Sequence, residues 1–146
     1  MKKAIALLII AAAACSSASE HGSFTDLEPA RKTMDEAMAL FVKSDIEGGF
    51  GKLRNYWPLP SGEIDTVIEK SVEQRKRIAF RFGDSLGYEL VRQQRLGDSL
   101  VRFVYIEKFE RSALRWNFVL YKPADSWTFD SISWDDNLQA LFDLQP

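Results

Sequence analysis

The chain of 146 residues contains a single cysteine, Cys15, and a single histidine, His21. A lone thiol cannot form an internal disulfide, so we expect no disulfide framework. From residue 24 onward neither residue type occurs, which leaves zinc and other soft-ligand metals almost nothing to bind. The same absence removes the histidine that usually activates a serine or threonine nucleophile. We therefore expect no metal and no cofactor.

Long apolar runs are also absent, apart from one near the start. Residues 4–14 are apolar, follow Lys2 and Lys3, and are too short for a permanent membrane helix, which needs roughly 20 residues. Small residues follow, as in an export signal. We predict that residues 1–15 form the export-signal region, residues 16–23 a flexible tether and residues 24–146 a single domain.

Residues 12–15, Ala-Ala-Ala-Cys, resemble the lipobox of bacterial lipoproteins. The resemblance implies that Cys15 receives a diacylglyceryl group, becomes the mature N-terminus and anchors the protein to a membrane. Ser16 is similar to the residue that directs such lipoproteins to the outer membrane. The implied location is therefore the periplasmic face of a membrane, with the outer membrane favoured. The alternative is ordinary cleavage after Ala14 or Ala18, which would release a soluble periplasmic protein.

The charge of the mature chain is mildly acidic. Removal of Lys2 and Lys3 leaves 17 basic residues against 21 acidic residues, a formal charge of −4. Nucleic-acid binding requires a basic field, so we expect no nucleic-acid partner. The basic run Arg75, Lys76 and Arg77 is interpreted as a solvated helix face.

Residues 24–83 have the apolar periodicity of three helices. The predicted buried stripes are Ala30, Met34, Ala37, Met38 and Phe41 in the first helix, Ile46, Phe50, Leu53 and Trp57 in the second, and Ile64, Val67, Ile68, Val72, Ala79 and Phe82 in the third. Pro58 and Pro60 end the second helix, and Gly83 ends the third.

The pattern changes to a period of two after residue 86. Residues 88–94, 100–109, 114–121 and 127–133 are predicted strands joined by short connections, which indicates an antiparallel four-stranded meander. Asp135 or Asp136 is expected to cap a short C-terminal helix, a role favoured over a hard-metal site. The predicted fold class is α+β, with three N-terminal helices packed on one face of a curved sheet.

A two-residue turn at Arg111 and Ser112 would place Glu107 opposite Trp116 and align one apolar face of the sheet. The candidate ligand-binding residues on this face are Tyr88, Arg92, Phe103, Tyr105, Glu107, Trp116 and Phe118. For the last connection, a four-residue loop would bury Trp127 and Phe129 with Ser131, whereas a three-residue loop would bury Asp130. The first is favoured, because it buries aromatic side chains and leaves the carboxylate in water.

Glu107 is the one carboxylate in phase with this apolar face. Beside Trp116, Tyr88 and Tyr105 it would be desolvated, which raises the pKa of a carboxyl group and suits a general base. The alternative, which we favour, is a wet rim position or an ion pair with Arg92 or Arg115.

The order of three helices, a long antiparallel meander and a helical tail resembles the nuclear transport factor two-like superfamily over residues 24–142. The resemblance implies a cone-shaped fold that encloses a pocket. In its isomerase-like and cyclase-like enzymes, groups such as Glu107, Tyr88 and Tyr105 would lie inside the cone. Many exported members resemble non-catalytic binding or accessory domains, and this chain fits them better.

Three functions are therefore open at this point. The favoured one is an exported, lipid-anchored, non-catalytic binding or accessory domain that takes a small apolar ligand or an envelope protein. An isomerase, dehydratase or cyclase with Glu107 as general base is the alternative. An assembly accessory that acts only through its surface is a third possibility, and it predicts a packed interior without an enclosed cavity.

Overall fold

The computed structural model describes residues 21–143, so the predictions for the export signal and for Cys15 lie outside the described residues. Three helices come first: α1 (Leu27–Val42), α2 (Ile46–Leu53) and α3 (Ser61–Phe82), with a 3-10 turn η1 (Arg54–Tyr56) between the last two. Asp26 and Asp45 cap α1 and α2, each by accepting a hydrogen bond from a first-turn backbone N–H. The predicted apolar stripes of α1 and α2 are confirmed, because every residue in them is buried.

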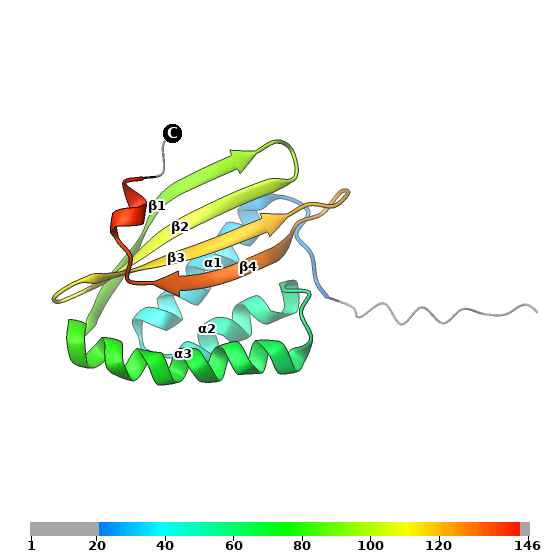
Figure 1. Cartoon of the computed structure of the whole chain (residues 1–146). Coiled ribbons are helices and arrows are strands. Elements are labelled where there is room, and N and C mark those ends of the chain that lie inside the picture. The colour runs from blue at the N-terminus through cyan, green and yellow to red at the C-terminus, as the bar shows by residue number, and fades with distance from the viewer. Residues whose placement is uncertain (1–20, 144–146) are drawn as a thin grey trace, which may run out of the picture.

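Four antiparallel strands follow in the spatial order β1-β2-β3-β4. They are β1 (Ser85–Leu96), β2 (Leu100–Phe109), β3 (Ala113–Tyr121) and β4 (Thr128–Asp135). Figure 1 shows a twisted sheet with the three helices on one of its faces. The predicted α+β class and four-stranded meander are confirmed. The expected C-terminal helix is only a 3-10 turn, η2 (Gln139–Leu141), and Asp135 accepts a hydrogen bond from Asn137 N just before it.

The register of the β2–β3 hairpin differs from the prediction by two residues. Glu107 pairs with Leu114, and Trp116 pairs with Tyr105. The turn is longer because Glu110 N donates to Asp84 O and Arg111 N to Phe82 O, so these residues bond to the end of α3 and the start of β1. A shift of two residues preserves the side-chain alternation, and the predicted face therefore still points inward.

Two register irregularities move single residues to the outer face of the sheet. Tyr88 and Leu90 pair with inward-facing residues of β2, but the shift after Leu90 pairs Arg92 with Val104. The expectation that Arg92 shares the inner face is therefore wrong. In β4, Trp127 and Phe129 are buried as predicted, whereas a second shift pairs Ser131 with Val119 on the outer face and places Ile132 opposite Phe118.

Candidate functional site

Arg75 lies on the buried face of α3, and the expectation that it is solvated is wrong. Its side chain is 8% exposed, and the buried positions of α3 are Ile64, Ser71, Arg75, Ile78 and Phe82. These positions recur every three or four residues after Ser71, the spacing of one helix face. Ala79, predicted to be buried, is instead exposed.

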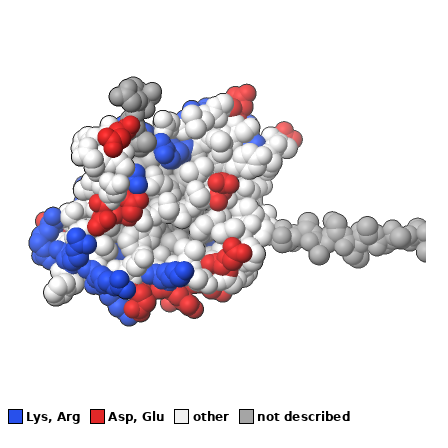
Figure 2. Space-filling view, viewed as in Figure 1, with Lys and Arg blue, Asp and Glu red and all other residues white. Residues whose placement is uncertain are grey.

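Lys76 and Arg77 are exposed, as predicted, together with Arg81 and Arg111 nearby. Figure 2 shows lysine and arginine side chains gathered over the end of the molecule where α3 terminates. Two of these side chains have acidic partners: Lys76 pairs with Glu73, and Arg81 lies 3.5 Å from Asp136.

Arg75 and Glu107 form a bidentate ion pair in the interior. Arg75 Nη1 donates to Glu107 Oε2 at 2.6 Å, and Arg75 Nη2 donates to Oε1 at 2.7 Å. Ser85 Oγ donates to Oε1 at 2.7 Å, and Trp116 Nε1 donates to Oε2 at 3.1 Å. Arg75 Nη2 also donates to Phe41 O at 3.1 Å. The site thus joins α1, α3 and three strands through one carboxylate.

These bonds oppose a catalytic role for Glu107. Its side chain is 0% exposed, and each carboxylate oxygen already accepts two hydrogen bonds, which fills the acceptor capacity of the group. A general base must reach the proton that it removes. The ion-pair interpretation agrees with the geometry, although the partner is Arg75. Arg115, one of the two arginines expected there, instead pairs with Asp135, at 2.6 Å.

The two candidate tyrosines lie next to each other on the inner face, with ring centroids 6.1 Å apart. Tyr105 is buried, and its hydroxyl donates to Asp35 Oδ1 at 3.0 Å. Burial and the nearby Asp35 carboxylate raise the pKa of the Tyr105 phenol well above its ordinary value. Burial, followed by Asp35, also raises the pKa of Tyr88. Both hydroxyls therefore stay protonated at neutral pH.

The remaining candidate ligand-binding residues on the inner face form the core. Phe103, Trp116 and Phe118 are buried, and Trp116 stacks on Phe41 with centroids 4.2 Å apart. Phe118 packs edge-on against Tyr105 at 5.6 Å. The two pockets described below are lined by none of the seven predicted ligand-binding residues. In this part of the domain, aromatic side chains occupy the interior where the superfamily resemblance implies a cavity.

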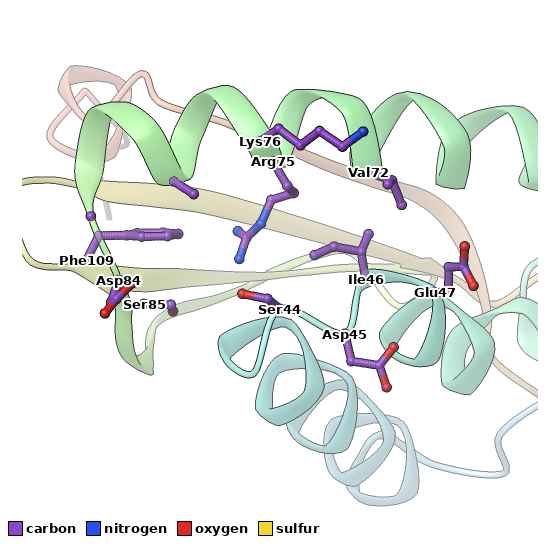
Figure 3. Close-up of a pocket in the computed structure, with 12 residues that line it drawn as sticks. Ser44, Asp45, Ile46, Glu47, Val72, Arg75, Lys76, Asp84, Ser85 and Phe109 are labelled. Atoms are coloured by element: carbon purple, nitrogen blue, oxygen red, sulfur yellow. The ribbon is translucent and has the colours of Figure 1, made fainter.

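A pocket of about 410 Å³ instead lies beside the ion pair, between α3, the start of α2 and the start of β1. Figure 3 shows the Arg75 side chain descending from α3 toward the loop that carries Ser44. The pocket is lined by Ser44, Asp45, Ile46, Glu47, Val72, Arg75, Lys76, Ala79, Gly83, Asp84, Ser85 and Phe109. No sequence motif predicts this pocket, because its walls come from four separate segments.

The chemistry of the pocket combines an apolar wall with charged side chains of both signs, namely Arg75 and Lys76 and the acidic residues Asp45, Glu47 and Asp84. Ile46, Val72 and Phe109 supply apolar surface. An arginine has five N–H donors, and the bonds to Glu107 and Phe41 use one on Nη1 and two on Nη2. Such a pocket can hold a small apolar group that carries a hydrogen-bond acceptor.

Residues 21–143 contain neither a cluster of metal ligands nor a membrane-spanning helix. No group of three or more histidine, cysteine, aspartate or glutamate residues suited to a metal ion occurs among them. Asp135 and Asp136 are engaged by Arg115 and Arg81. Within the same described residues, no helix has the length and apolar character needed to cross a bilayer.

Comparisons with protein-family models, with curated protein sequences and with solved structures found no significant match to this chain.

Proposed function

We propose that this chain is an exported, non-catalytic binding domain of the bacterial envelope, anchored through acylated Cys15. Export and anchoring are supported by Lys2 and Lys3, the apolar residues 4–14 and the lipobox-like residues 12–15. The order of helices and strands agrees with the resemblance to the nuclear transport factor two-like superfamily, which stays part of this proposal.

The observation that carries the binding function is the pocket of about 410 Å³ beside a saturated ion pair. Its size suits a small molecule or one large side chain of a partner protein. Because the Glu107 carboxylate has no free acceptor, it is not available as a general base, and the pocket offers recognition by shape and by Arg75 N–H groups. We therefore infer that it takes a small apolar ligand, or an apolar side chain of an envelope protein.

The test uses 8-anilinonaphthalene-1-sulfonate, a fluorescent probe with an aromatic body and one anionic group. We expect one probe to bind per folded domain, with a blue-shifted emission. Ala79 lines the pocket yet is exposed, so Ala79→Trp can fill the pocket without disturbing the core. Gln74→Trp, at another exposed position of α3 outside the pocket, is the matched control.

Loss of probe binding in Ala79→Trp, with binding retained in Gln74→Trp, would support the pocket as the binding site. Equal binding by both variants, or no binding by the folded parent, would contradict it. Thermal melting of each variant shows whether a lost signal reflects unfolding.

A further inference from the structure

The described chain begins at one particular end of the domain, which we call the tether end. Phe24 and Trp127 form an antiparallel bridge, with N–H···O distances of 2.9 and 2.8 Å. Lys122 N donates to Ser99 O at 2.9 Å, which joins the β3–β4 loop to the β1–β2 loop. Figure 1 shows both loops and the start of the chain at the same end, opposite the turn that links β2 to β3.

An apolar row lies exposed at the tether end. Leu96, Leu100 and Tyr121 are direct neighbours across β1, β2 and β3. Their side chains are 64%, 37% and 42% exposed, on the sheet face opposite the helices. A shallow hollow of about 200 Å³, lined by Leu96, Leu100 and Val119 among others, adjoins them. Clustered exposed apolar side chains mark surfaces that contact another phase or molecule.

Cationic side chains lie at the same end of the sheet as this apolar row, two of them toward the inner face and one on the outer face. Arg95 and Lys122 both lie over the Trp127 ring, 5.9 and 5.1 Å from its centroid. Arg102 Nη2 donates a hydrogen bond to Gln94 Oε1 on the outer face of the sheet, beside the apolar row. The two loops also carry the acidic residues Asp98 and Asp125. Long basic side chains beside apolar ones are suited to the headgroup level of a bilayer.

The length of the chain before the described residues limits the orientations that the domain can adopt on a membrane. Five residues lie between Cys15 and His21, so six residue-to-residue steps join the two. Fully extended, they span at most about 22 Å. The ten residues of β2 alone span roughly 33 Å along the domain. With a lipid on Cys15, the connecting residues are therefore too short for the opposite end of the domain, where Phe80 is 88% exposed, to contact the membrane.

We propose that the tether end rests on the bilayer, with Leu96, Leu100 and Tyr121 at the lipid interface and the neighbouring cations among the headgroups. This inference rests on the proposed anchoring at Cys15, and it adds an orientation to it. The pocket beside Arg75 is built from the ends of α3 and β2 and the start of β1, so it would then face away from the membrane.

The experiment attaches the mature chain, beginning at Cys15, to vesicles of phosphatidylcholine and phosphatidylglycerol that contain a maleimide lipid. Cys15 is the only cysteine, so the coupling is specific. It also bypasses natural acylation, which keeps a failure of the orientation distinct from a failure of the anchoring proposal. Amide hydrogen exchange is then compared between coupled and free protein. We expect amides of residues 97–99 and 124–126 to exchange more slowly on the vesicle, and those of residues 110–112 to be unchanged.

Leu96→Ser/Leu100→Ser should reduce that slowing by at least about tenfold, since burial of even one leucine side chain accounts for roughly a factor of ten in affinity. Phe80→Ser is the matched control at the opposite end and should leave it unchanged. Slowing confined to residues 76–83 or 110–112, or slowing abolished by Phe80→Ser, would overturn the proposal. The proposal would also be overturned if, in the free protein, the amides of residues 97–99 exchanged more slowly as the protein concentration increased. That result would show that a second copy of the chain covers the apolar row.

Discussion

Replacement of Glu107 by glutamine tests the most tightly bonded group of the domain. The amide keeps the shape of the side chain but removes its charge and one of its two acceptor oxygens. Arg75, 8% exposed, would then remain buried without the charge of Glu107, and two of the four groups that now donate to the carboxylate would face an N–H. Loss of one partner of a buried ion pair is far more costly than loss of both.

The expected cost is about 3–5 kcal/mol of unfolding free energy. A domain of this size has a total stability of about 5–15 kcal/mol, so the variant should be marginal. Its melting temperature should fall by roughly 10–20 °C. Ser85→Ala, which removes only one hydrogen bond to the carboxylate, should cost less, about 1.5–3 kcal/mol.

Urea denaturation followed by circular dichroism measures these differences. Glu73→Gln is the matched control, because Glu73 pairs with Lys76 at the surface with both side chains about two-thirds exposed. It should leave stability close to that of the parent, because exposed ion pairs contribute little. If Glu107→Gln cost no more than this control, the carboxylate would not be the counter-ion that we describe, and its role as a base would have to be reconsidered.

The remaining predictions concern a pH dependence and two glycines. Because burial raises the pKa of Tyr105 above its ordinary value of 10.0, the unfolded chain loses this proton first and stability should fall as the pH rises above about 10. Tyr105→Phe should flatten that fall in denaturation curves recorded between pH 8 and pH 11, while an unchanged slope would contradict the assignment. Gly83→Ala should lower stability by about 1–3 kcal/mol, because φ is +82° there and an added Cβ would lie 2.1 Å from Glu110 Oε2. Gly51→Ala, with open space around it in α2, should raise stability by about 0.5–1 kcal/mol. Thermal melting of both glycine variants checks these two predictions, and a Gly83→Ala variant more stable than Gly51→Ala would contradict them.

Most of the fold could be predicted from local patterns. The stripes of α1 and α2 follow from helical spacing, and the four strands follow from alternation and short connections. The burial of Trp127 and Phe129 followed from the cost of burying Asp130 in their place. In each case, residues close in the sequence contain the information.

The failures arise where distant segments decide the structure. The β2–β3 turn is lengthened by backbone bonds to Phe82 and Asp84, which no pattern near residue 110 reveals. The basic run Arg75, Lys76 and Arg77 favours a solvated face for Arg75, although its spacing from Ser71 and Ile78 places it on the buried face. Once Glu107 was suspected of burial, the spacing on α3 was the signal that could have identified its partner.

The pocket lay beyond sequence reasoning for a similar reason. Its walls combine residues 44–47, residues 72–79, residues 83–85 and Phe109, and Arg75 in one of these walls is paired with Glu107 on β2, the strand that carries Phe109. None of these segments carries a recognisable motif. Only the packing of α3 across the start of the sheet brings them together.

The central claim is that a lipid on Cys15 anchors a non-catalytic binding domain outside the cytoplasm. The most direct measurement is native and intact-mass spectrometry of the protein purified from the membranes of the cell that makes it. The account predicts a chain that starts at Cys15 and carries acyl groups, with a small molecule or a partner bound at neutral pH. A chain that retains Met1 through Ala14, or one that is cleaved but carries no lipid, would contradict it.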